Sequence, residues 1–354
     1  MTAADDQTHE GTPSIAPSLL TRLEDEDDAG RRDSLQREFS TVKHAIERQV
    51  PDQAGLVEDL LIALLAEGHL LLAGTAGLTE TAAIEALAAA LRTGFRRIQM
   101  TPDLEVADWA AHDEQPQEGA DPPAASARFW GDIVLIEDFD RAPAQVQSAF
   151  GEALDGQRLF SRREAAAAAM PALLLASLTP LEEATGAHLS RSQRDRFLMQ
   201  LATPAPSHSA ELAALRRHRR AAQDEEAEPT EPSLALDEPQ LSRARRRVLD
   251  LHLAPAVEDY LVGLVQATRA PERQQRTLAG WLRDAPGFRA TLALERCARA
   301  HAWLAGRDYV SPDDVHAVAP GVLRHRLLLS DAARAAGRTP DDLVAALLGC
   351  LPVV

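Results

Sequence analysis

The stretch HLLLAGTAGLTET, residues 69–81, indicates the fold of the chain. A short apolar run leads into a turn that contains Gly74 and Gly77, and a helical pattern follows over 82–91. This combination builds a phosphate-binding loop, because glycine lets backbone N–H groups curl around an anion and the helix N-terminus adds its positive end. The stretch therefore predicts an α/β domain that holds a phosphate group at this turn.

One position of the loop departs from the usual pattern. A lysine normally precedes the final Ser or Thr, where it meets the β- and γ-phosphates, and here that position is Glu80. Two unit charges about 4 Å apart interact by about 4 kcal/mol at an effective dielectric near 20. The reversed charge replaces an attraction by a repulsion, so we expect phosphate affinity to fall by about three orders of magnitude or more. A carboxylate is also favourable at a helix N-terminus, which gives Glu80 a structural explanation.

Bulk composition excludes several classes of protein. A net charge of −17 over 354 residues argues against a nucleic-acid or anionic-membrane surface. No apolar run is long enough for a membrane span, and the polar N-terminus does not resemble a signal peptide. The only cysteines, Cys297 and Cys350, are too few for a disulfide framework or a zinc site. We expect a cytoplasmic protein without membrane insertion.

Composition also divides the chain into four segments. Residues 1–34 are rich in acidic residues, Thr and Pro and are expected to be a disordered arm. Residues 35–206 alternate apolar runs with helical patterns, and 207–240 combine a basic helix with an acidic, Pro-rich linker. Residues 241–354 are helical in pattern almost throughout and form a second domain.

The apolar runs of the first domain predict a parallel sheet. Runs at 97–100, 132–136 and 173–176 join the run before Gly74, and helices separate them. Such alternation gives a parallel sheet covered on both faces, with ligands at the carboxyl ends of the strands. The Gly74 turn, the acidic pair Glu137 and Asp138, and Thr179 each follow a run, so we expect them to meet at one edge.

Six ordered motifs resemble the MoxR family of AAA+ ATPases over roughly residues 40 to 345. A single loop motif would be weak, but six in the same order make the resemblance specific. They are the run LLAEGHLLL at 64–72, RIQMTPDL at 97–104, DRAP at 140–143, QRDRF at 193–197, GRDYVSPDDV at 306–315 and VLRHR at 322–326.

The resemblance implies both an architecture and partners. It implies a P-loop AAA+ αβα domain followed by an all-helical lid, assembled as a ring that is usually hexameric, with nucleotide bound between subunits. It also implies a chaperone or activator of other protein complexes, often with a von Willebrand A-domain partner. ATP and Mg²⁺ are the cofactors that the family uses.

The resemblance also assigns roles to individual residues. Glu137 and Asp138 stand where the family has Asp and then Glu, which orient Mg²⁺ and polarise the attacking water. Thr179 stands in place of an Asn that senses the γ-phosphate, and Arg196 matches the arginine finger offered to the neighbouring subunit. The nucleotide-binding positions are Gly74, Thr75, Ala76, Gly77, Leu78, Thr79, Glu80, Thr81 and Arg289, the last matching the arginine of the lid. Mg²⁺ would be held by Thr81 and Glu137.

The departures fall on the groups that a subunit needs for its own nucleotide. Asp138 is one methylene shorter than the family's Glu, and a displacement of about 1 Å can cost about 100-fold in rate. Arg196, the group offered to a neighbour, is intact. The first hypothesis is therefore a subunit with weak or absent hydrolysis that works beside an active MoxR paralogue in a mixed ring.

Two alternatives stay open. In the first, the protein is an active ATPase with a rewired site, in which Glu137 and Asp138 share the magnesium and Arg289 replaces the missing lysine. In the second, it is a nucleotide-free interaction scaffold, in which Glu80 pairs with Arg196 or Arg289 and fills the phosphate site internally.

Overall fold

The computed structural model describes the greater part of the chain, and its centre is a five-stranded parallel sheet. The described residues are 34–73, 77–103, 133–156, 158–159, 168–169, 172–178, 189–201, 207–223 and 235–352. The strands follow the order β2-β3-β6-β1-β7. Their bounds are β1 Leu70–Ala73, β2 Phe95–Gln99, β3 Ile133–Glu137, β6 Leu173–Leu178 and β7 Met199–Leu201. The predicted parallel sheet is confirmed, and β3 includes Glu137 as its last residue.

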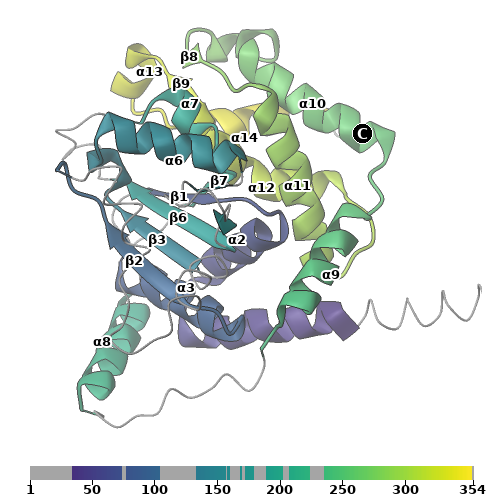
Figure 1. Cartoon of the computed structure of the whole chain (residues 1–354). Helices are drawn as coiled ribbons and strands as arrows, with labels where there is room; N and C mark the ends of the chain where they lie inside the picture. The colour runs from purple at the N-terminus through teal and green to yellow at the C-terminus, as the bar shows by residue number, and fades with distance from the viewer. Residues whose placement is uncertain are drawn as a thin grey trace, which may run out of the picture.

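The alternation of side chains along the strands creates two separate cores. Leu70, Leu135 and Leu175 point to one face, which α2 (Ala54–Leu65) and α3 (Leu78–Ala90) cover. Leu71 and Leu174 point to the other face, which α6 (Ala144–Gly156) covers. Both faces of the sheet are therefore buried, as Figure 1 shows, and for this reason the central strands are continuous apolar runs.

Shorter elements connect the layers of this domain. A 3-10 turn, η2 (Phe139–Arg141), follows β3, and a short helix, α7 (Arg191–Arg194), precedes β7. Strand β4 (Arg158–Leu159) pairs antiparallel with β5 (Ala168–Ala169). The basic helix is α8 (His208–Gln223), which extends away from the sheet in Figure 1.

The C-terminal part of the chain is the predicted helical domain, with one short strand pair added. Its longer helices are α9 (Glu238–Leu249), α10 (Pro255–Arg269), α11 (Phe288–Leu304), α12 (Pro312–Leu323) and α14 (Pro340–Cys350). Shorter helices are η3 (Pro271–Arg273), η4 (Arg276–Leu278), η5 (Arg324–Arg326) and α13 (Asp331–Ala335). Strands β8 (Leu282–Asp284) and β9 (Leu328–Leu329) pair antiparallel within this helical domain. The sequence did not predict this pair.

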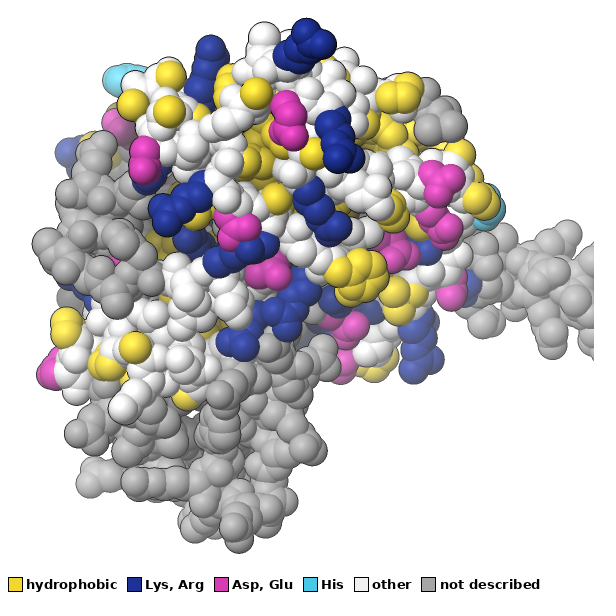
Figure 2. Space-filling view, turned by 90° about the horizontal axis from the view of Figure 1, so that it is seen from above, with side chains coloured by type: hydrophobic (Ala, Val, Ile, Leu, Met, Phe, Trp, Pro, Cys, Tyr) yellow, Lys and Arg dark blue, Asp and Glu magenta, His cyan; other side chains and the backbone are white. Residues whose placement is uncertain are grey.

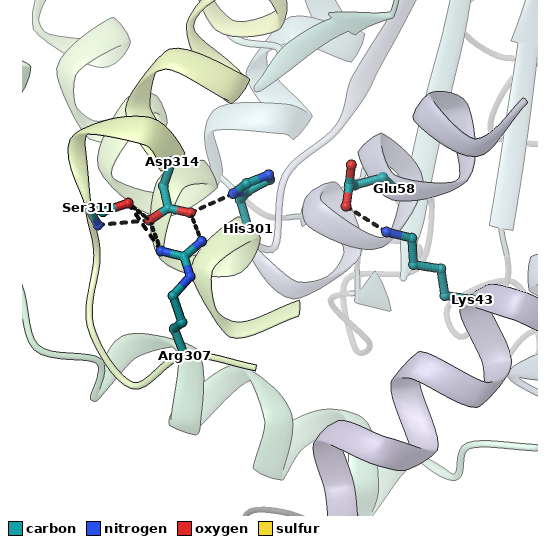
Figure 3. A network of polar contacts seen from close by, with 6 residues as sticks. All are labelled: Lys43, Glu58, His301, Arg307, Ser311 and Asp314. Carbon is teal, nitrogen blue, oxygen red and sulfur yellow. Dashed lines mark hydrogen bonds and ion pairs between the residues drawn. The ribbon is translucent and has the colours of Figure 1, made fainter. Parts of the chain in front are cut away.

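A buried carboxylate joins α11 to α12 (Figure 3). Asp314, at the start of α12, accepts two hydrogen bonds from the guanidinium of Arg307, and His301 Nδ1 lies 2.6 Å from its other side. The backbone N–H and hydroxyl of Ser311 each donate to the same carboxylate at 2.8 Å. All these donors hold the pKa of Asp314 well below its usual range although burial acts in the opposite direction.

The helix over residues 34–49 ties the two domains together. Phe39 packs edge-on against Trp303 of α11 with ring centroids 5.0 Å apart. Lys43 donates to Glu58 of α2 at 2.6 Å, as Figure 3 shows. The larger apolar core therefore runs without a break from the sheet into the helical domain.

The surface over the helical domain carries no uniform charge. Figure 2 shows Lys and Arg side chains interspersed with Asp and Glu on the face seen from above. Within the described residues, no helix combines the length and apolar character needed to cross a membrane.

Candidate functional site

The described part of the loop places Glu80 directly over the start of α3. Gly77 precedes the first residue of the helix and has an extended backbone. A Cβ atom added at Gly77 would lie 2.5 Å from Glu80 Oε2, so the carboxylate lies against the glycine backbone. Leu78, Thr79 and Thr81 also lie in the first turns of α3, whereas Gly74, Thr75 and Ala76 fall outside the described residues.

Glu137 is held by an arginine from the neighbouring strand. Arg97 Nε donates to Glu137 Oε2 at 2.6 Å, and Nη2 donates to Oε1 at 2.7 Å. The parallel register pairs Gln99 with Glu137, which brings β2 side chains beside the end of β3. The hydrogen bonds and the charge of Glu137 raise the pKa of Arg97. Both carboxylate oxygens of Glu137, which was expected to bind magnesium, therefore already accept hydrogen bonds from Arg97.

Asp138 is also held by a side chain of β2. Its backbone adopts the left-handed conformation, with φ 52° and ψ 44°, which is uncommon for a residue other than glycine. Gln99 Nε2 donates to Asp138 Oδ2 at 2.8 Å, and the Asp138 N–H donates to Ser177 Oγ at 3.1 Å. Asp138 Oδ1 is buried without a hydrogen bond among the described residues. Backbone strain and an unpaired buried oxygen at one residue are typical of functional sites.

Arg196 lies in a segment that the helical domain holds in place. A Cβ atom added at Gly151 of α6 would lie 1.9 Å from Arg196 Nη1, so the guanidinium lies against the backbone of Gly151. Arg326 of η5 donates to the Phe197 carbonyl at 2.6 Å and to Asp195 Oδ1 at 2.8 Å. The residues on both sides of Arg196 are therefore fixed to the helical domain through Arg326.

Arg289 occupies the exposed first turn of α11. Burial lowers the pKa of Arg326, and the nearby positive charge of Arg289 acts in the same direction. Arg289 therefore lies near Arg326, and its contact with phosphate stays a prediction. Thr179 falls outside the described residues, so its sensing role stays a prediction.

A cavity of about 690 Å³ opens between α2 and α12, beside the carboxyl end of β1. Ala73, the last residue of β1, lines it directly before the glycine turn. Asp59 of α2 also lines the cavity, and burial, reinforced by the charge of Glu58, raises the pKa of its carboxyl to about 6. The volume of the cavity lies in the range of small-molecule binding sites.

The residues of the candidate site fit the base and sugar of a nucleotide better than its magnesium-bound phosphates. The cavity beside β1 has room for a base and a sugar. A magnesium-bound triphosphate does not fit the side chains as they stand, because Glu80 lies over the helix start and Arg97 covers the carboxylate of Glu137. We therefore derive no hydrolytic step for this chain.

Sequence reasoning missed three residues that shape this site. Arg97 and Gln99 stand two positions apart on β2, so their side chains share one face of the sheet and can reach the consecutive acids Glu137 and Asp138 at the end of β3. That spacing was the available signal, but its use requires the strand register. Asp59 gave no signal, because the cavity exists only where α12 meets α2.

Comparison with known proteins agrees with the described geometry. The family model "ATPase family associated with various cellular activities (AAA)" matches residues 69–199, and "AAA lid domain" matches 284–347. The chain is 32% identical to chaperone MoxR1 of Mycobacterium tuberculosis over 319 residues, which is 89% of this chain and 83% of that protein. It is 30% identical to protein MoxR of Paracoccus denitrificans over 311 residues, 83% of this chain and 89% of that protein.

A solved structure gives the same result. The crystal structure of a candidate ATPase from Cytophaga hutchinsonii matches 94% of this chain, and 99% of its own, with a TM-score of 0.81 at 25% identity. Sheet order, lid and sequence identity over most of the chain agree, and this protein belongs to the MoxR family of AAA+ ATPases.

Proposed function

We propose that this chain is a MoxR-type AAA+ subunit with weak or absent ATP hydrolysis, and that it acts beside an active MoxR paralogue in a mixed ring. The observation that carries the proposal is the two-bond contact between Arg97 and Glu137. A carboxylate that accepts both of these bonds can bind magnesium only after it exchanges one cation for another. Glu80 at the helix start acts in the same direction, because it repels the phosphates.

The groups that a neighbouring subunit would use are retained. Arg196 is present, and Arg326 links the residues beside it to the lid. A movement of the lid would therefore move Arg196 within its own subunit. In the proposed ring, this chain completes the neighbour's site with Arg196 and transmits conformational change through the lid to a client complex. A von Willebrand A-domain partner is the further component that the family resemblance implies.

The first test measures ATP hydrolysis in mixtures. The chain alone is expected to show little turnover, and it should raise the rate of the active paralogue from the same genome. Arg196→Ala is expected to remove that stimulation. Arg194→Ala is the matched control, because Arg194 stands where the family motif has leucine. A stimulation that survives Arg196→Ala contradicts the proposal.

A second measurement separates this proposal from the two alternatives. Calorimetry with ATP and ADP is expected to show weak binding that strengthens from the native protein to Glu80→Gln and further to Glu80→Lys, since each step removes negative charge. Turnover by the chain alone that is lost in Glu137→Gln would instead support the rewired ATPase. Absence of heat and of a thermal shift in all three proteins would support the nucleotide-free scaffold.

A further inference from the structure

The outer face of α11 carries an ordered row of side chains. At helical spacing on this face lie Leu292, Arg296 and Arg299, each of them at least partly exposed. Leu292 keeps 44% of its surface exposed. Trp303, one turn after Arg299, is buried, and the row ends there. Counted back from Trp303, the face of the helix therefore presents two arginines and then an apolar side chain.

The end of α9 widens this row. Arg245, Arg246 and Leu249 are three or four positions apart, so they share one face of α9. Leu249 is 59% exposed, and exposed Arg246 makes no hydrogen bond or ion pair with any residue that the structure describes. Arg299 donates to the carbonyl oxygens of Leu249 and Leu251, which joins the two helices. We call this surface the arginine patch; it consists of Arg245, Arg246, Leu249, Leu292, Arg296 and Arg299.

The arginine patch keeps a positive charge in a strongly acidic protein. Arg245 Nη1 lies 3.4 Å from Glu67 Oε1, and Arg299 Nε donates to Glu295 Oε1 at 2.9 Å. Four arginines against these two acids leave a charge of +2, whereas the whole chain carries −17. Among the described residues, Arg296 makes no ion pair and donates to the carbonyl oxygen of Glu67 at 3.2 Å. The patch therefore favours an anionic partner.

The shape of the patch indicates what kind of partner fits. Three of its arginines and the end of α2 line a hollow between α9 and α11. The volume of this hollow is about 10 Å³, which leaves room for no more than one water molecule. A small-molecule ligand does not fit there. The patch fits a polypeptide segment that lies across its surface, with acidic side chains for the arginines and apolar ones for the exposed leucines.

The chain itself contains such a segment. Residues 1–33 lie outside the described residues, and their sequence complements the patch. The run EDEDD occupies 24–28, and the run LLTRL precedes it at 19–23. Counted back from residue 34, the chain presents two arginines at 31–32, then five acids, and then leucines. Acids followed by leucines is the order that matches the arginines and then the leucine of α11.

The first described helix begins close enough for this contact. Gln36 Nε2 donates to the carbonyl oxygen of Trp303 at 3.3 Å, and Figure 1 shows α9 beside the same helix. Arg299 and Arg296 precede Trp303 by about 6 and 10 Å of α11. The six residue steps from Asp28 to residue 34 span up to about 20 Å when extended. The acidic run can therefore reach both arginines while the described structure stays as it is.

We propose that residues 19–28 of this chain dock on the arginine patch, with the acids of 24–28 on Arg246, Arg296 and Arg299 and the leucines against Leu249 and Leu292. Each exposed ion pair contributes little by itself. The tether supplies an effective concentration of about millimolar, so several weak contacts together hold the segment. The inference does not depend on whether the protein binds nucleotide.

The docked segment would lie across the junction of the two domains. Arg245 of α9 donates to the carbonyl oxygen of Leu64 at 3.1 Å, and Arg296 of α11 donates to that of Glu67. Both acceptors belong to the end of α2 and the turn after it, in the sheet domain. An acidic segment on these arginines therefore contacts the helices that join the lid to the sheet domain.

Cleavage of the full chain by a glutamate-specific protease tests the contact. Glu24 lies inside the acidic run, and Glu10 lies outside it in the same N-terminal region. Mass spectrometry of the released peptides gives the ratio of the initial cleavage rates at Glu24 and Glu10. At low salt, this ratio is expected to be about tenfold lower in the native protein than in the double variant Arg246→Gln/Arg296→Gln. At about 0.5 M salt, where charges are screened over about 4 Å, the difference should disappear.

Two further variants show whether the positive charges of the patch are responsible. The double variant Arg246→Lys/Arg296→Lys keeps both charges and should retain most of the protection. Arg276→Gln removes an exposed arginine in η4, outside the patch, and should leave the ratio unchanged. Circular dichroism checks that each variant is folded.

Three outcomes would overturn the inference. Equal ratios in the native protein and in Arg246→Gln/Arg296→Gln would show that the acidic run does not contact the patch. An equal loss of protection in Arg276→Gln would mean that total charge, rather than the patch, controls cleavage. Protection that rises with protein concentration would assign the patch to the acidic run of a second copy, against docking within one chain.

Discussion

Two carboxylates of this protein each take a pair of hydrogen bonds from an arginine, one in the lid and one at the edge of the sheet. Asp314 is paired with Arg307, and Glu137 with Arg97. The side chain of Asp314 is fully buried, whereas Glu137 keeps 10% of its side-chain surface exposed. Arg97 is 55% exposed and Arg307 only 28%. The same pair of groups therefore stands in two different dielectric surroundings.

The difference shows which ion pair is structural and which can be exchanged. Asp314 takes further bonds from His301 and Ser311, so its oxygens are saturated and water cannot replace the partners. Removing one partner of such a buried pair leaves an uncompensated charge. Glu137 depends on one arginine that is half exposed, so this pair contributes less to the stability of the fold. Burial of the arginine thus decides the role of the pair.

The largest expected effect is at Asp314. Asp314→Ala should lower the free energy of unfolding by about 3–5 kcal/mol, because it leaves the Arg307 charge and the Ser311 donors at a buried junction. Urea denaturation followed by circular dichroism measures the change. The control is Asp331→Ala, whose ion pair with Arg334 is exposed and should contribute less than about 1 kcal/mol. Equal losses in the two variants would show that the Asp314–Arg307 ion pair contributes no more to stability than an exposed one.

A smaller effect of opposite sign is expected at Asp59. Because its pKa of about 6 in the fold lies above the ordinary aspartate value of 3.8, this carboxyl stabilises the fold at low pH, and that contribution is lost as pH rises through about 6. At pH 8 the native carboxylate is charged in a buried position, which costs stability, and Asp59→Asn removes that cost. The free energy of unfolding of the variant should therefore be about 2–3 kcal/mol higher than that of the native protein at pH 8. The gain should shrink toward pH 5. Asp314, with its lowered pKa, follows the reverse rule and loses its contribution only in strong acid.

Paired denaturation curves at pH 8 and pH 5 test this sign for Asp59. Asp331→Asn is again the matched control, with no pH-dependent difference expected. A native protein that is more stable than Asp59→Asn at pH 8 would mean that the carboxylate has a stabilising partner.

The sequence predicted the strands and the order of motifs well, because both depend on local patterns. Residues 70–73 before Gly74 and 133–136 before Glu137 are apolar at every position, as buried parallel strands require. Glu137 was expected after its strand and is its last residue, since its backbone continues the pairing with Gln99. The antiparallel strand pair of the lid was missed because Leu282–Asp284 and Leu328–Leu329 are too short to show a period of two.

The state of the candidate site could not be predicted from the sequence, because it depends on contacts between distant segments. Arg97 and Glu137 are 40 residues apart and meet only through the β2–β3 register. The contact between Gly151 and Arg196 likewise requires α6 to lie against the residues before β7. The identity of Glu80 could be read directly, but its position over Gly77 could not.

The smallest expected effect on stability, and the sharpest test of the comparison, is at Arg97. Arg97→Met should change the free energy of unfolding by less than about 1 kcal/mol, because the guanidinium is largely solvated. It should also free both oxygens of Glu137, so that magnesium strengthens ADP binding about tenfold more in the variant than in the native protein, an effect of about 1.4 kcal/mol. Fluorescence titration with a labelled ADP, with and without Mg²⁺, measures this ratio.

Arg96→Met is the control for Arg97→Met, because alternate residues on β2 point to opposite faces of the sheet. The control should leave the magnesium effect unchanged. If Arg97→Met instead destabilises the fold by about 3 kcal/mol without any gain in magnesium dependence, the Arg97–Glu137 ion pair stabilises the fold in the same way as the buried ion pair of Asp314 in the lid. Exposure of the arginine would then be no guide to which of the two carboxylates can exchange its cation, and the proposed weak hydrolysis would depend on Glu80 alone.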